Sequence, residues 1–444
     1  MIDNFREFAL FLTLAIASPV AADDWSMYLY DPAHSSFNAS EFRIGKQNVA
    51  TLDQYWVSNL SAPMAAAPTV VGGVVYVGTW DGNFYALDAG TGAPLWSTFV
   101  GMAPNPSIPC FQQGIGVTSQ AVVSGDAVIV GGGDSAVYGL DKATGALLWR
   151  LPLANPADGA YLWSSVTAYK NALYIGIASL GDCPLVRGAL VRIDLADPHG
   201  PLFRWLVPEG AIGGGIWSTP AIDGATNTVF VTTGTGEQDP ESGTWGGTML
   251  ALDATSLEVR SHFLLPTNSV DYDIEWGSSP MLFETSDGVP LVAATGKDGV
   301  LYAQLRDDLS PAWAAVIATE CICPECGCGS ISTPAFDGHL LYVGAGAAPD
   351  SDYELGSVYG IDPDDGEIQW RCLLEAPVIA PVTLANGLVY VSTEAGLNIL
   401  DAATGEMLWS DGRQPLIYSQ PVVLGGSVYS TQFNGDVVAW QPSR

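Results

Sequence analysis

A repeated motif is the strongest constraint that the amino-acid sequence places on the fold. Residues 68–96 read PTVVGGVVYVGTWDGNFYALDAGTGAPLW, and residues 121–149 read AVVSGDAVIVGGGDSAVYGLDKATGALLW. Aligned copies, several of them degraded, begin at positions 68, 121, 166, 220, 280, 334, 381 and 421. Self-similarity at spacings of this size is typical of solenoids and propellers. The sequence therefore predicts eight structural units of one kind.

Each copy contains short apolar runs separated by turn signals, without helical periodicity. A β-branched run is followed by a hairpin signal such as Asp81-Gly82 and then by a second alternating run. An Asp-x-x-Thr-Gly turn comes next. A tryptophan follows it at a fixed offset, at Trp96, Trp149, Trp370 and Trp409. We expect this tryptophan to pack between neighbouring sheets. Together these features predict an all-β fold, an eight-bladed β-propeller.

The eighth copy stops at residues 437–440, before its outer strand. Residues 52–57, LDQYWV, precede the first copy and look like an outer strand that contains a tryptophan. We expect this N-terminal strand to complete the eighth sheet and close the ring, because closure removes exposed strand edges. Residues 23–444 are then predicted to form a single domain.

Acidic residues outnumber basic residues 47 to 15, which gives a formal net charge of −32. Nucleic acids and anionic membrane surfaces are therefore not expected partners, since both require clustered Lys and Arg. The chain has only four lysines, Lys46, Lys142, Lys170 and Lys297. A lysine directed into a site would stand out against this background.

The N-terminal residues have the pattern of an export signal. Residues 8–17 form the apolar run FALFLTLAIA, and residues 20–22 supply small side chains for cleavage. We interpret residues 1–22 as a signal peptide, with a buried N-terminal helix as the alternative. The run is too short to span a bilayer, and no membrane span is predicted. Export implies a periplasmic or secreted protein.

The seven cysteines are interpreted in the light of that compartment. Four of them, Cys321, Cys323, Cys326 and Cys328, fall within eight residues of one loop. Disulfides are expected in an oxidising compartment, and Zn²⁺ or Cu⁺ binding by the cluster is the alternative. Cys110 and Cys183 lie in loops of neighbouring predicted blades, where they could form a bridge. An odd number of cysteines leaves at least one unpaired.

The repeat also resembles that of a known family. The segment ALDAGTGAPLW, residues 86–96, looks like the repeat of pyrroloquinoline quinone (PQQ) propellers. Residues 25–52 are similar to the opening segment of the polyvinyl-alcohol-dehydrogenase-like branch. The resemblance implies an exported PQQ-dependent dehydrogenase that oxidises a polymeric or secondary alcohol and passes electrons to an external acceptor such as a cytochrome c. Outer-membrane assembly lipoproteins carry the same repeat without a cofactor. The alternative is therefore a cofactor-free scaffold or a ligand-binding propeller with a degenerate PQQ pocket.

The resemblance implies cofactor-binding roles for three residues. Trp217, in GGGIWSTPAID, matches the tryptophan that stacks under the quinone, and Lys297, in TGKDGVLY, matches the lysine that contacts the quinone oxygens. Arg187, in LVRG, matches an arginine that could meet a cofactor carboxylate. The alternatives are a core tryptophan, a solvated hairpin lysine and an arginine in a structural ion pair.

The catalytic base and the metal ligands are expected in three other segments. In DYDIEWGSSP, residues 271–280, Asp273 matches the first acid of the family pattern and Glu275 replaces the second. Either could accept the alcohol proton, and a solvated acidic loop is the alternative. The expected metal is Ca²⁺, which takes oxygen ligands. Thr235 stands where the family has an Asn ligand, and the nearest acids to the family's ligand positions are Asp182 and Glu237.

Overall fold

The computed structural model describes residues 24–103, 114–182, 184–268, 273–320, 323–351, 354–412 and 418–443. In this part of the chain strands dominate, and the helical elements are the single 3-10 turns η1 (Val49–Thr51), η2 (Pro156–Asp158) and η3 (Pro324–Cys326). None of these helices is long enough to cross a membrane. The predicted signal peptide lies outside the described residues.

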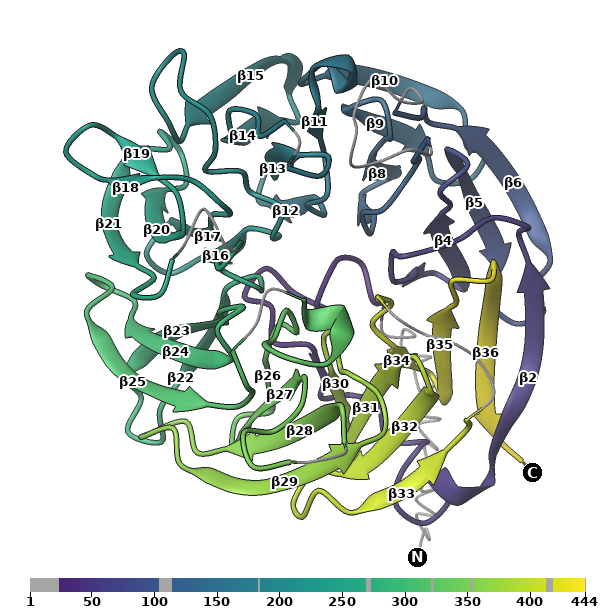
Figure 1. Ribbon diagram of the computed structural model, residues 1–444. Helices are drawn as coiled ribbons and strands as arrows, with labels where there is room; N and C mark the ends of the chain where they lie inside the picture. The colour runs from purple at the N-terminus through teal and green to yellow at the C-terminus, as the bar shows by residue number, and fades with distance from the viewer. Residues whose placement is uncertain are drawn as a thin grey trace, which may run out of the picture.

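The strands form eight sheets arranged in a ring (Figure 1). Blades 1 and 2 comprise β3 (Thr69–Val71), β4 (Val74–Gly78), β5 (Asn83–Asp88) and β6 (Pro94–Phe99), then β7 (Val122–Ser124), β8 (Ala127–Gly131), β9 (Ala136–Asp141) and β10 (Leu147–Pro152). Blades 3 and 4 comprise β11 (Ala160–Tyr161), β12 (Thr167–Tyr169), β13 (Ala172–Ser179), β14 (Ala189–Asp194) and β15 (Asp197–Trp205), then β16 (Ala221–Asp223), β17 (Thr228–Thr232), β20 (Thr248–Asp253) and β21 (Val259–Leu264). A hairpin of β18 (Gln238–Asp239) and β19 (Thr244–Trp245) is inserted in blade 4.

The remaining blades follow the same order. Blades 5 and 6 comprise β22 (Met281–Glu284), β23 (Pro290–Thr295), β24 (Val300–Leu305) and β25 (Pro311–Val316), then β26 (Ala335–Phe336), β27 (Leu341–Ala345), β28 (Gly356–Ile361) and β29 (Ile368–Leu374). Blades 7 and 8 comprise β30 (Thr383–Ala385), β31 (Leu388–Thr393), β32 (Gly396–Asp401) and β33 (Met407–Ser410) with β1 (Phe37–Asn38), then β34 (Val422–Leu424), β35 (Ser427–Thr431) and β36 (Asp436–Pro442) with β2 (Leu52–Asn59).

The innermost strands of the blades begin one or two residues after the predicted starts of the eight copies, so the predicted eight-bladed propeller is confirmed. In the eighth sheet, β2 pairs antiparallel with β36, from Leu52 opposite Pro442 to Asn59 opposite Asp436. This sheet thus combines strands that are distant in the sequence (Figure 1).

Tryptophans on outer strands bind the Asp-x-x-Thr-Gly turn of the next blade. The indole Nε1 of Trp96 donates to the carbonyl of Lys142 at 3.1 Å, and that of Trp370 donates to Ala402 at 3.0 Å. The indole faces cover the turn glycines so closely that a Cβ at Gly145 would lie 2.5 Å from the Trp96 ring. The repeated tryptophan therefore packs between neighbouring sheets, as we expected.

Residues 24–38, which we call the strap, run along the innermost strands. Backbone carbonyls of the strap accept hydrogen bonds from the amides of Val70, Val123, Ile222, Leu282, Phe336 and Leu384, at 2.6–3.0 Å. These six amides belong to blades 1, 2, 4, 5, 6 and 7. Asn38 adds a side-chain bond to the Val423 carbonyl in blade 8, at 2.9 Å. The strap therefore ties most of the ring together around its axis.

Candidate functional site

A cavity of about 520 Å³ lies at the centre of the ring, and residues from all eight blades line it. Two sequence positions in every blade contribute to the lining. The first ring consists of the residues four positions before each innermost strand: Ala65, Thr118, Trp163, Trp217, Gly277, Ile331, Ile379 and Tyr418. The second ring consists of the residues two positions before each strand: Ala67, Gln120, Ser165, Thr219, Ser279, Thr333, Pro381 and Gln420.

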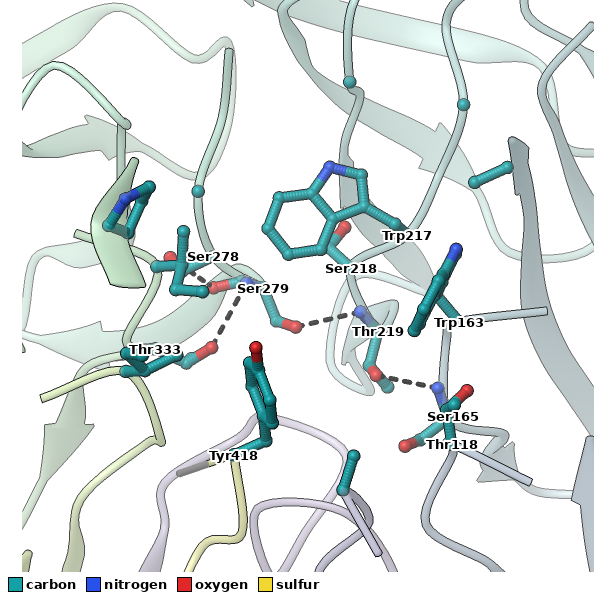
Figure 2. Close-up of a pocket in the computed structure, with 18 of the residues that line it drawn as sticks. Thr118, Trp163, Ser165, Trp217, Ser218, Thr219, Ser278, Ser279, Thr333 and Tyr418 are labelled. Carbon is teal, nitrogen blue, oxygen red and sulfur yellow. Dashed lines mark hydrogen bonds between the residues drawn. The ribbon is translucent and has the colours of Figure 1, made fainter. Parts of the chain in front are cut away.

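Hydrogen bonds link the second ring from blade to blade. The amide of Gln120 donates to Ser165 Oγ at 2.9 Å, and the amide of Ser165 donates to Thr219 Oγ1 at 3.0 Å. The chain continues from Thr219 to Ser279 at 2.8 Å and from Ser279 to Thr333 at 3.2 Å (Figure 2). In these four contacts, each hydroxyl accepts a hydrogen bond from the segment that leads into the preceding blade.

Trp217 projects into the central space from blade 4, and Trp163 and Tyr418 approach it from blades 3 and 8 (Figure 2). The glycines before Trp217 allow close backbone contacts. Gly213 and Gly214 have φ of +97° and +65°, where side chains are strained, and a Cβ at Gly215 would lie 3.1 Å from Ala178. The glycine run is therefore explained by the packing of blade 4 against blade 3 as well as by the pocket.

A cluster of charged groups lies beside Trp217. Lys297 Nζ lies 2.9 Å from both Asp273 Oδ2 and Glu275 Oε1, and 5.7 Å from the centre of the Trp217 ring. The Trp217 indole Nε1 donates to Glu275 Oε1 at 3.0 Å. Thr235 Oγ1 lies 2.7 Å from Glu275 Oε2 and 3.0 Å from Asp273 Oδ1. The pocket therefore brings together the predicted floor, the predicted lysine and both candidate bases.

The negative charges in the pocket shift the pKa of two groups. Burial works against the charged form of Lys297, but the nearby carboxylates of Glu275 and Asp273 outweigh it and raise the lysine pKa above its usual value. The pKa of Asp182 is raised to about 6, first by desolvation and then by the charges of Glu275 and Asp273. Lys297 thus stays an ammonium, whereas Asp182 titrates near neutral pH.

Two predicted site residues do not line the pocket. The Arg187 guanidinium lies 4.5 Å from the centre of the Trp205 ring, and its Nε donates to the Val207 carbonyl at 2.9 Å. Glu237 is exposed at the start of the β18–β19 hairpin, and it too is absent from the lining. Arg187 therefore has a local partner on β15, and Glu237 faces solvent.

The expected Ca²⁺ ligands are not assembled. Asp182 and Thr235 line the pocket without Glu237, and Thr235 is used as a donor to Glu275 through both its hydroxyl and its amide. In the part of the chain that the structure describes, no group of three His, Cys, Asp or Glu side chains is arranged to hold a metal. Lys297 supplies the positive charge beside Asp273 and Glu275. The expected ligands Asp182, Thr235 and Glu237 therefore do not fit a Ca²⁺ site.

A flat quinone fits the pocket better than the metal does. The Trp217 ring offers a stacking surface, Lys297 offers a donor above it, and the serines and threonines of the second ring offer hydroxyls for carboxylates. The described lining holds four acids, Asp182, Asp273, Glu275 and Glu325, and Lys297 is its only Lys or Arg. An anionic cofactor would therefore depend on hydroxyl donors and on counter-ions from solution.

Sequence reasoning missed Trp163, although the repeat contains the signal for it. Trp163-Ser164-Ser165 and Trp217-Ser218-Thr219 stand at equivalent positions of consecutive blades, and the two tryptophans belong to the first ring. Tyr418 occupies the same position in blade 8. An alignment of the segments just before each copy would have placed Trp163 and Tyr418 at the position of Trp217.

Part of the cysteine cluster contributes to the pocket wall. Cys323 and Cys326 form a disulfide across η3, and the intervening Pro324 and Glu325 line the cavity. Cys328 is disulfide-bonded as well, and Cys372 is a free thiol. Cys110, Cys183 and Cys321 lie outside the described residues, so the predicted Cys110–Cys183 bridge stays a prediction.

Comparisons with known proteins extend this description. The polyvinylalcohol dehydrogenase of a Pseudomonas species is 23% identical over an alignment that covers 88% of this chain and 71% of that protein. The enzyme of the same name from Sphingopyxis sp. strain 113P3 is 22% identical, over 88% of this chain and 67% of that protein. Among solved structures, a europium-containing methanol dehydrogenase has a TM-score of 0.79 at 16% identity, covering 94% of this chain and 98% of that chain. At 16% identity, the similarity to the methanol dehydrogenase shows the fold alone.

A protein-family model, PQQ_2, described as outer membrane protein assembly factor BamB, matches residues 45–179 and 297–444. The unmatched residues between these segments include blade 4 with Trp217, and the segment that carries Asp273 and Glu275. The matched segments contain most or all of blades 1, 2, 6, 7 and 8, together with parts of blades 3 and 5, and make up more than half of the chain. On this evidence of fold and sequence, the chain belongs to the PQQ_2 family of propellers.

Proposed function

We propose that the protein is a PQQ-dependent alcohol dehydrogenase. The observation that carries this proposal is the cluster in which Lys297 lies above Trp217 and contacts Asp273 and Glu275, within one cavity. The names of its relatives, polyvinylalcohol dehydrogenases at 22–23% identity, support the same activity. The proposed substrate is an alcohol, polymeric or secondary.

Three side chains that line the cavity would have separate roles in the reaction. PQQ, when bound, would supply an ortho-quinone that can accept two electrons from the alcohol in the form of a hydride. Trp217 would hold the flat ring, and Lys297 would donate a hydrogen bond to a quinone oxygen. Asp273, which lines the cavity and whose side chain is 44% exposed, would take the hydroxyl proton. The alcohol thereby loses one proton and one hydride and becomes a carbonyl compound.

We propose that the electrons pass to a cytochrome c. We also propose export to the periplasm or the medium, from the pattern of residues 1–22. We assign no step to Ca²⁺, because the expected ligands do not come together.

A cofactor-free scaffold or ligand-binding propeller is the second candidate function. The description of the family model as an outer membrane assembly factor favours it, and so does the acid-rich pocket lining. Against it, the residues that the family model leaves unmatched are those that carry Trp217, Asp273 and Glu275. The proposed enzymatic function therefore depends on a segment that the family model does not match.

A dye-reduction assay tests the proposal. Purified protein is incubated with PQQ and CaCl₂, as a counter-ion, and offered a primary alcohol, a secondary alcohol and polyvinyl alcohol. We expect alcohol-dependent reduction by the wild type and a loss of about 100-fold or more in Asp273→Asn. Glu284→Gln, which removes an exposed acid of the same blade, should retain the activity. Absence of any alcohol-dependent reduction would favour the scaffold.

A further inference from the structure

Glu275 has an unusually complete set of hydrogen-bond donors. Its Oε1 accepts from Trp217 Nε1 at 3.0 Å and from Lys297 Nζ at 2.9 Å. Its Oε2 accepts from the Thr235 hydroxyl at 2.7 Å and from the Thr235 amide. The residue is only 4% exposed. A carboxylate offers about four lone-pair sites, so those of Glu275 are all in use within the protein.

Asp273 has a different environment. Its Oδ2 contacts Lys297 at 2.9 Å, and its Oδ1 competes with Glu275 for the single hydroxyl proton of Thr235. Its side chain is 44% exposed, against 5% for that of Glu275. Asp273 also has φ of +51°, a left-handed conformation that Asp tolerates better than most residues. Of the two carboxylates, Asp273 is the one with lone pairs open to the cavity.

The backbone around Glu275 also holds this residue close to Lys297 and Trp217. The Lys297 amide donates to the Glu275 carbonyl at 3.0 Å, which sets the two residues side by side. A Cβ at Gly234 would lie 2.7 Å from Glu275 Oε2 and 3.2 Å from Trp217 Cδ1, so only glycine leaves room there. One carboxylate therefore joins side chains from blades 4 and 5 across a close-packed junction.

We propose that Glu275 is a positioning residue that fixes the Trp217 ring and the Lys297 ammonium toward the bound quinone, while Asp273 alone accepts the proton. This inference rests on the proposed function for its kinetic consequences, whereas the contacts themselves exist without a cofactor. Because every lone pair of Glu275 faces a donor, the isosteric change to Gln would set an amide NH₂ against an N–H or O–H donor. Trp217 and Lys297 would then lose their common orientation.

The test compares Glu275→Gln and Glu275→Asp with Asp273→Asn, and uses Glu284→Gln as the matched control. The PQQ affinity is measured by equilibrium dialysis with CaCl₂, and kcat is measured at saturating PQQ. We expect Glu275→Gln to raise the Kd for PQQ about 10- to 100-fold and to retain turnover at saturating PQQ. Asp273→Asn should leave the Kd within about 3-fold and lose turnover. Glu275→Asp, which retains the charge, should recover part of the affinity.

The opposite pattern overturns the inference. If Glu275→Gln loses turnover at an unchanged Kd while Asp273→Asn retains it, Glu275 is itself the base. A second readout needs no cofactor: the ¹⁵N-indole resonance of Trp217 in the apo-protein, assigned with Trp217→Phe. We expect its N–H proton to move upfield in Glu275→Gln and to stay in Glu284→Gln, and an unmoved signal contradicts the positioning role. If the wild type binds no PQQ while this signal moves, the proposed function fails and the positioning contacts stand.

Discussion

Single residues in this propeller are fixed by partners that lie far away in the sequence. Trp217 and Lys297 could be singled out from family-like motifs, and both line the pocket. Arg187 was singled out in the same way, but its guanidinium lies over Trp205 at the end of β15 and does not line the pocket. The direction of a loop side chain depends on such packing, so a motif indicates the segment and not the contact. Asp273 and Glu275 could not be ranked from sequence because their exposure is a property of the assembled ring.

His34 provides a test at this scale. It is fully buried in the strap, its Nδ1 contacts the Pro280 carbonyl at 2.7 Å, and burial, opposed by that carbonyl, lowers its pKa to about 4. Unfolded His titrates near 6.5, so the unfolded chain takes up the proton first as the pH falls. We expect the free energy of unfolding to decrease between about pH 6.5 and pH 4, by up to about 3 kcal/mol from this residue alone.

Urea denaturation at pH 7, 6, 5 and 4 measures the effect. His34 has φ of +67°, which Asn also tolerates, so His34→Asn is the appropriate variant. The variant should be less stable at pH 7 because it packs less well, yet its stability should fall less steeply with acid. Parallel pH curves for the two proteins would show that His34 is not the titrating group.

At the scale of elements, the repeated motif connects each blade to the next through its tryptophan and its turn. The strand starts could be predicted because the copies begin with similar short apolar runs rich in β-branched residues, as in Val122–Ser124 and Val422–Leu424. The β18–β19 hairpin was not predicted, because an insertion has no counterpart in the other copies. The tryptophan contact with the following turn explains why Asp, Thr and Gly recur at fixed distances from it.

Substitution of two glycines distinguishes the effect of the tryptophan contact on stability from the effect of backbone strain. Gly145 and Gly125 both have positive φ, +71° and +60°, but a Cβ at Gly145 would meet Trp96 at 2.5 Å while one at Gly125 would meet nothing within 4 Å. Both Ala variants should lose about 1 kcal/mol to the left-handed backbone. Gly145→Ala should lose about 1–3 kcal/mol more from overpacking, measured as a lower urea midpoint. Equal losses would mean that the tryptophan contact adds no constraint.

For the whole molecule, the closed ring depends on segments without any repeat. Residues 24–38 could be likened to the opening segment of a related branch, but their path could not be predicted, since they have no periodicity. The structure shows the strap bonded to six innermost strands, and it brings Tyr28 to the pocket. The two rings of residues before those strands are then held around one cavity.

Removal of the strap tests this role. A chain that begins at residue 39 keeps β2 in the eighth sheet but loses the carbonyl partners of Val70, Val123, Ile222, Leu282, Phe336 and Leu384. Hydrogen exchange followed by mass spectrometry should show faster exchange of these innermost strands than in a chain that begins at residue 24. Peptides from the outer strands should change least. Unchanged protection of the innermost strands would show that the ring closes without the strap.

The central claim is that the pocket at Trp217 binds PQQ, and the most direct measurement is equilibrium dialysis of PQQ against the purified protein with CaCl₂. We predict saturable binding of one PQQ per chain. Trp217→Leu should weaken this binding about tenfold or more, because a ring of this kind gains about 1–3 kcal/mol by stacking. Trp205→Leu removes a tryptophan outside the pocket lining and should bind PQQ as the wild type does. No saturable binding, or equal losses in both variants, would contradict the account.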